Sequence, residues 1–103
     1  MIAVGARDLF DAYQDDEKEA DKLFKDKILE VVGSVAWSRS VFGNYYVVFG
    51  SSSFISAWGV QCAMKDKTDP RLSKIKKGDR VKIRGRCEGF TMDVILKECM
   101  LVD

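Results

Sequence analysis

The hydrophobic pattern changes once along this chain, near residue 27, and the change limits the folds open to it. From residue 6 to 26, apolar side chains recur at the three- and four-residue spacing of one helical face. After Lys27 they alternate with polar residues and β-branched residues become frequent, as in strands. We therefore predict an amphipathic helix over 6–26, in which the polar segment 14–19 is either a weak point or a break between two shorter helices. The residues expected to pack it are Leu9, Phe10, Tyr13, Leu23 and Phe24.

Five later segments are typical of strands, and their order along the chain indicates the fold. They are placed at 28–38, 44–50, 54–65, 79–88 and 92–102. Between the third and the fourth, Asp69 suits a helix N-cap, Pro70 the first helical position and Gly78 the residue past the end, which predicts a short helix over 70–77. This is the chain order of a five-stranded OB-fold, an all-β Greek-key barrel with helices. An SH3-like barrel also has five strands but does not need the second helix.

The 103 residues are predicted to form one OB-fold domain over 1–103, with the barrel at 27–103, because no internal repeat or linker divides the chain. Gly33 marks either a sharp bend in the first strand or a simple interruption of it. The apolar runs are too short to cross a bilayer, and residues 1–6 are too short for a signal peptide, although an upstream export signal is compatible with them. The predicted core residues are Ile28, Val31, Val35, Val48, Val60, Cys62, Val81, Ile83, Val94 and Leu96.

The residue types exclude most catalytic chemistry. The chain has no histidine, so neither Ser-His-Asp and Cys-His arrangements nor a histidine metal site can form. Three cysteines do not complete a four-thiolate zinc site, and the glycine at residue 50 lacks the lysine and helix of a phosphate-binding loop. We predict a protein that is not an enzyme and that has no cofactor and no metal site.

Charge is distributed unevenly although the net charge is only +1. Residues 1–30 hold five Lys/Arg and nine Asp/Glu, whereas residues 65–86 hold ten Lys/Arg and three Asp. In the fourth predicted strand, alternation puts Lys82, Arg84 and Arg86 on the face opposite Val81 and Ile83. This basic stripe is either a solvated strand face or a surface that binds a polyanion.

Two cysteines lie on the last two predicted strands, which are hairpin neighbours. Cys87 and Cys99 are therefore a candidate disulfide, with Cys62 buried and free. If Cys62 and Cys99 are adjacent instead, that pair becomes the candidate. The remaining alternative is that all three are small buried thiols of a reduced protein.

Three segments together resemble a known family over nearly the whole chain. They are "LFDAYQDDEKEADKLFKDKILEVVGSV", "GVQCAMKD" and "LSKIKKGDRVKIRGRCEGFTMDVILKECMLV", and they are similar to the tRNA_anti-like family of OB-fold proteins. The resemblance implies a barrel with an N-terminal helix and a nucleic-acid-binding role by analogy with anticodon-binding domains. Many members look like exported or lipid-anchored bacterial proteins, which implies the cell envelope or periplasm and favours the disulfide, although no lipobox cysteine stands near residue 1. The cytoplasm is the alternative compartment.

An OB-fold usually binds its ligand on the outer face of its second and third strands and on the adjoining loops. Those regions supply aromatic rings, of which any single one is more often part of the core. One hypothesis is a module that binds single-stranded nucleic acid, with bases stacked on rings and phosphates held by cations. The other is an envelope module that binds a protein or a small ligand and no nucleic acid. The residues assigned to the first are Trp37, Arg39, Tyr45, Lys65, Lys82, Arg84, Arg86 and Phe90.

Overall fold

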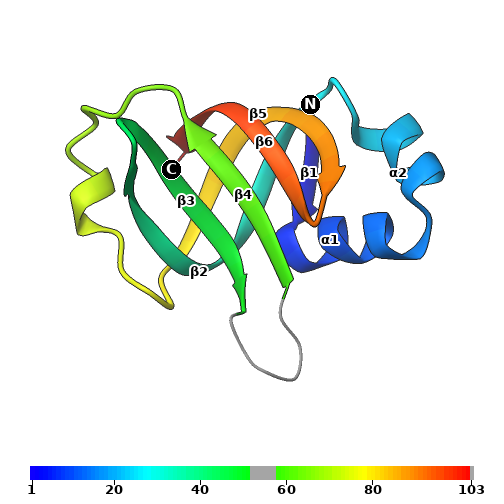
Figure 1. The fold of residues 1–103 in the computed structure, drawn as a ribbon, viewed down its shortest axis with the longest axis horizontal. Helices are drawn as coiled ribbons and strands as arrows, with labels where there is room; N and C mark the ends of the chain where they lie inside the picture. Colours follow the sequence, from blue (N-terminus) through cyan, green and yellow to red (C-terminus); the bar gives the residue numbers. More distant parts are fainter. Residues whose placement is uncertain (52–57, 103) are drawn as a thin grey trace.

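The computed structural model describes residues 1–51 and 58–102, and within these ranges five strands close into a mixed barrel (Figure 1). The strands are β2 (Ile28–Val41), β3 (Asn44–Ser51), β4 (Trp58–Met64), β5 (Arg80–Thr91) and β6 (Asp93–Val102). Their order is β2-β3-β4-β6-β5, and pairing of β5 with β2 closes the ring. Only β4 and β6 are parallel among these pairs. This Greek-key order is consistent with the predicted OB-fold. The part of the third predicted strand at 54–57, including Phe54, lies outside the described residues.

A sixth strand, β1 (Ile2–Gly5), lies outside the barrel and was not predicted. It pairs in parallel with the first half of β2, with Ile2 opposite Leu29 and Gly5 opposite Val32. Four residues are too few to display an alternating pattern, so nothing in the sequence distinguishes this segment from a disordered terminus. Because β1 pairs with β2, the chain is already attached to the barrel wall where it enters the first helix.

The N-terminal helical region consists of two helices, α1 (Ala6–Asp15) and α2 (Glu17–Phe24), so a continuous helix over 6–26 is wrong and the alternative of a break is confirmed. The break falls at Asp16, whose backbone is extended and whose carboxylate accepts a hydrogen bond from the Glu19 backbone N–H at 3.2 Å. An aspartate in this position caps the second helix and ends the first. Leu23, predicted to pack inward, is exposed, because α2 packs on the core through Ala20 and Phe24 instead.

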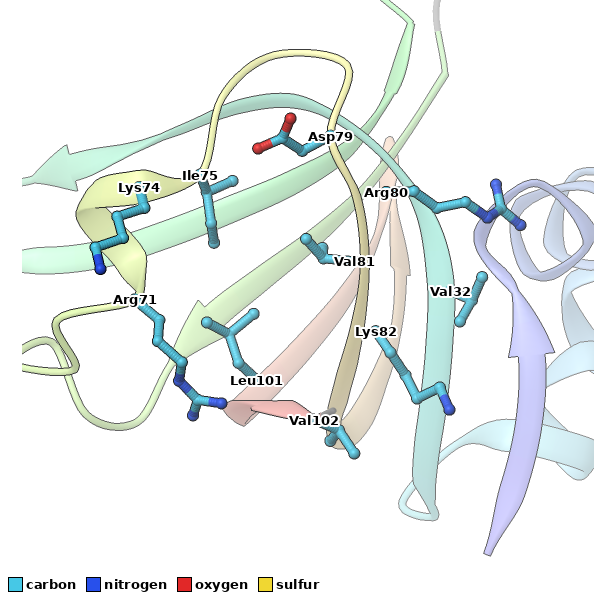
Figure 2. Close-up of a pocket in the computed structure, with 10 residues that line it drawn as sticks. All are labelled: Val32, Arg71, Lys74, Ile75, Asp79, Arg80, Val81, Lys82, Leu101 and Val102. Carbon is cyan, nitrogen blue, oxygen red and sulfur yellow. The ribbon is translucent and has the colours of Figure 1, made fainter.

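The predicted helix over 70–77 is also wrong, because this segment contains only a single 3₁₀ turn, η1 (Leu72–Lys74; Figure 2). Both α-helices precede the barrel strands. Aspartates at each end explain the difference: Asp69 accepts from the Arg71 N–H at 2.9 Å, and Asp79 accepts from the Lys76 N–H at 2.9 Å. These local bonds favour turns over a helix. Only Leu72 is buried here, so a longer helix would have no apolar face to pack.

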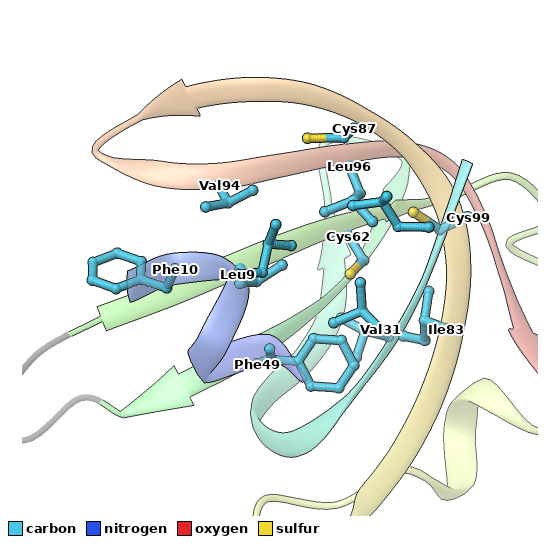
Figure 3. Close-up of a cluster of buried hydrophobic side chains, with 14 of the residues drawn as sticks. Leu9, Phe10, Val31, Phe49, Cys62, Ile83, Cys87, Val94, Leu96 and Cys99 are labelled. Carbon is cyan, nitrogen blue, oxygen red and sulfur yellow. The ribbon is translucent and has the colours of Figure 1, made fainter. Parts of the chain in front are cut away.

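The core fills the barrel and is covered at one end by α1, whose Leu9 and Phe10 point toward the strands (Figure 3). Eight of the ten predicted core residues are buried, seven of them in the core cluster and Val48 on the outer side of β3, whereas Ile28 is 44% exposed and Val81 is half-buried. Ile28 pairs with Arg86 on the outer side, and its neighbour Leu29 takes the inward position. Gly33 lets α1 approach, since a Cβ there would lie 2.8 Å from that of Ala6. Further core residues that the sequence did not single out are Val47, Phe49 and Leu72.

All three cysteines lie in the described ranges, are buried and are free, so the candidate Cys87–Cys99 disulfide is not formed (Figure 3). The pairing of β5 with β6 places Cys87 opposite Leu96, and Gly85 is the β5 residue that lies against Cys99. The Cys87 Sγ instead lies 3.5 Å from the Tyr13 hydroxyl. Cys99 lies beside Cys62, and their hydrogen bond, together with burial, raises the pKa of the Cys62 thiol. The two adjacent cysteines are therefore Cys62 and Cys99, the alternative candidate pair from the sequence.

Candidate functional site

The outer face of β2 and β3 carries an aromatic ring and a cation that are held together on β2. A bulge in β2 between Val35 and Trp37 shifts the alternation, so that Trp37 lies opposite Val48 and Arg39 opposite Tyr46. Because Val47 and Phe49 point into the core, these four side chains face outward. The Arg39 guanidinium carbon lies 4.3 Å from the centre of the Trp37 ring, in cation–π contact. The bulge thus presents an indole and a guanidinium as one unit.

A groove of about 350 Å³ begins at this unit. Its walls include Trp37, Val48, Trp58 and Gly59, and Asp93 of β6 lies at one end. A Cβ on Gly59 would lie 3.0 Å from the Asp93 carboxylate, which shows how closely that carboxylate approaches β4. The groove therefore combines aromatic walls, which suit a flat apolar group, with a carboxylate that accepts hydrogen bonds.

Two exposed apolar turn residues flank the face at opposite ends. Phe42 is fully exposed at the β2–β3 turn, and Met92, 89% exposed, forms the β5–β6 turn beside the groove. The Lys67 ammonium donates to the Gly43 carbonyl at 3.2 Å, so the 65–67 segment lies next to the Phe42 turn. Large apolar side chains at the tips of turns are available to a ligand that lies between them.

Two of the aromatic residues assigned to binding lie on the inside. The Tyr45 hydroxyl accepts from the Ser38 hydroxyl at 3.0 Å and donates to the Leu72 carbonyl at 3.1 Å, which anchors η1. Phe90 stacks on Tyr13 with ring centres 5.8 Å apart and packs against the core. Strand alternation alone did not reveal their direction, because both follow turns or register shifts.

The basic stripe on β5 is largely neutralised. Arg84 bonds Glu30 on β2 at 2.8 Å, and Arg86 bonds Glu88 at 3.0 Å and Glu98 on β6 at 3.1 Å. Lys82 has no ion pair within residues 1–51 and 58–102, and the exposed Lys65 lies at the end of β4, near the Phe42 turn. The structure therefore separates the predicted cations into paired and unpaired sets.

A second hollow, of about 430 Å³, lies between η1, the start of β5 and the end of β6 (Figure 2). Its floor is aliphatic and includes Ile75, Val81 and Leu101. Cations border it, among them Lys74, Arg80 and Lys82, while Arg71 bonds Asp69 at 2.8 Å. Sequence reasoning noted the basic excess over 65–86 but not Lys74 or Arg80 individually; the run "KIKKGDR" at 74–80 is the signal that would have found them.

A family model matches residues 1–101 of this chain. The chain belongs to the tRNA_anti-like family. This confirms the resemblance seen in the sequence, and it covers β1, both helices and the whole barrel of the tRNA_anti-like chain.

One solved structure shares this fold over the whole chain. A "putative nucleic acid-binding lipoprotein" from Klebsiella pneumoniae subsp. pneumoniae MGH 78578 superposes with a TM-score of 0.74 at 14% identity, covering 100% of this chain and 92% of that one. Weaker similarities are to the S. pombe Stn1-Ten1 complex (TM-score 0.49, 18% identity, 73% of this chain and 57% of that one) and to yeast Stn1 and Ten1 (0.48, 9%, 99% and 63%). No curated protein matches the sequence significantly.

Neither a metal site nor a membrane-spanning helix is found in the part of the tRNA_anti-like chain that the structure describes. No group of three His, Cys, Asp or Glu side chains is arranged to hold a metal ion. No helix among the described residues has the length and apolar character needed to cross a membrane.

Proposed function

We propose that this tRNA_anti-like module binds single-stranded nucleic acid across the outer face of β3 and β4. The observation that carries the proposal is the Trp37–Arg39 unit on β2, whose Trp37 ring lines the groove. Bases stack on indole rings and on guanidinium planes, and a cation beside the ring contacts the phosphate. Membership of the tRNA_anti-like family and the similarity to the Klebsiella protein, a "putative nucleic acid-binding lipoprotein", support the same class of ligand.

The groove favours an unpaired base over a duplex. A base reaches the walls formed by Trp37 and Trp58 only when it is turned out of a helical stack. Inside, the Asp93 carboxylate accepts a hydrogen bond from an exocyclic amino group, as carboxylates do from cytosine N4. Beyond the groove, the strand runs along β3 and β4 toward Phe42 and Lys65, which supply a second ring and a second cation.

Fluorescence anisotropy with a labelled single-stranded oligonucleotide of mixed sequence, titrated at several salt concentrations, tests this proposal. Affinity should fall steeply with salt, because phosphate contacts release counterions. Trp37→Ala should weaken binding by about 1–3 kcal/mol, roughly 5- to 150-fold, with little change in the salt slope. Arg39→Gln should reduce the slope by about 0.7, the value for one phosphate of a single strand.

Two outcomes would contradict the proposal. If the wild-type protein does not bind the oligonucleotide at low salt, nucleic acid is not its ligand. The alternative hypothesis from the sequence, a module that binds a protein or a small ligand, then remains. Equal affinity for a duplex of the same sequence removes the preference for single strands. Thermal unfolding of each variant serves as the control for folding.

A further inference from the structure

We propose that the nucleic-acid path continues past Trp37 along the outer side of β2 to a second contact made by Lys77, Arg80 and Lys82. This inference rests on the proposed function and adds a contact on β5 and on the η1–β5 connection, away from the β3–β4 face. Three observations carry it: neighbouring hollows that share residues, cations without partners, and the direction of the cationic side chains.

The hollows follow β2 one after another, and the pairing of β2 with β5 connects the second to the third. The groove at Trp37 shares Ala36 and Ser51 with a hollow of about 360 Å³ that Ser34 and Lys77 also border. In the β2–β5 register, Ser34 lies opposite Arg80 and Val32 opposite Lys82. A third hollow, of about 370 Å³, contains Val32, Arg80 and Lys82. From Val32, which lies opposite Lys82, to Trp37, β2 therefore extends over roughly 17 Å at about 3.3 Å per residue.

The cations of this path are available for phosphates. Within the described ranges, no ion pair or side-chain hydrogen bond engages Lys77, Arg80 or Lys82, in contrast to the paired Arg84 and Arg86. A side-chain cation that is paired with a carboxylate must break that ion pair before it binds a phosphate. An unpaired cation has no such ion pair to break. The carboxylates bordering the hollows beside β5 are engaged, Glu30 by Arg84 and Asp79 by the Lys76 N–H.

The direction of the side chains suits an extended polyanion. Figure 2 shows Arg80 and Lys82 extending to the same side of β5 as Val32, while Val81 points the other way, toward Ile75. The cations therefore follow the strand in a line and do not converge on one enclosed point. A line of unpaired charges matches successive phosphates of a chain better than one compact anion.

The test compares two variants with the same charge change on the same strand. Arg80→Gln/Lys82→Gln removes two unpaired cations, and Arg84→Gln/Arg86→Gln removes two paired ones, with glutamine keeping part of each aliphatic stem. Binding to oligothymidylates of about 6 and about 15 nucleotides, within the site sizes of OB-folds, is measured across a range of salt. Lys77→Gln is measured separately.

The first variant should reduce the salt slope for the longer probe by about 1.4, equivalent to two phosphates, and should remove most of the affinity that the longer probe has over the shorter. The second variant should leave the slope within the error of the wild-type value. The extended path would be overturned if the two variants had equal salt slopes, or if the first variant kept the higher affinity for the longer probe. In either case, wild-type binding and its sensitivity to Trp37→Ala would still support the proposed function. Wild-type protein that binds neither probe would overturn both.

Discussion

Gly85 offers a sharp test of how β5 and β6 pack. A Cβ at this position would overlap the Cys99 Sγ and lie 3.2 Å from the Lys97 carbonyl oxygen, and both Gly85 and Cys99 are buried. The neighbours are a short side chain and backbone, which do not move aside easily. Gly85→Ala should therefore cost about 1–3 kcal/mol of unfolding free energy, the usual range for overpacking. At about 4–8 °C per kcal/mol for a domain near this size, the midpoint should fall by roughly 4–24 °C.

Urea unfolding followed by the fluorescence of the two tryptophans measures this cost. The matched experiment is a double-mutant cycle with Cys99→Ala, which removes the Sγ that the new methyl group would meet. The double variant should be more stable than the sum of the single costs predicts, by about 0.5–3 kcal/mol, because the two side chains are in contact. Additive costs, or a Gly85→Ala protein as stable as wild type, would show that the close approach of Cys99 does not constrain residue 85.

Two further predictions concern buried tyrosines. Burial, and then the hydrogen bond to Cys87, raise the pKa of Tyr13, so the folded state keeps the phenol proton where the unfolded state, with a pKa of about 10, releases it. Stability should be fully present below about pH 10 and fall above it by up to about 1.4 kcal/mol per pH unit. The thermal unfolding midpoints of wild type and Tyr13→Phe, measured from pH 8 to 11, should therefore approach each other only at the alkaline end of this range. Midpoints that run parallel over the whole range would contradict this reasoning. Tyr45→Phe should lose about 0.5–1.5 kcal/mol through its bonds to Ser38 and Leu72, measured by urea unfolding, with unchanged oligonucleotide affinity. A loss of affinity as large as that of Trp37→Ala would place the Tyr45 ring at the ligand.

Local patterns in the sequence were enough to predict the barrel. The period of two along β2 and β5 identified Val31 and Ile83 as inward residues, and both are fully buried. The same reasoning found the five barrel strands, and it noted a break within the polar segment 14–19 as an alternative. These features depend on spacing along one segment, which a sequence displays directly.

Partners across strands depended on the tertiary structure. Glu30 and Glu98, which neutralise Arg84 and Arg86, lie 54 and 12 residues away from them in the chain. The register shift between β2 and β3 decided that Trp37 faces outward with Arg39. The pairing of β5 with β6 placed Gly85, and not Cys87, against Cys99, and Cys87 contacts Tyr13 instead. The physical reason is that alternation is a property of one strand, whereas a bulge changes which residues of two strands lie opposite each other and so reassigns every side-chain pair beyond it.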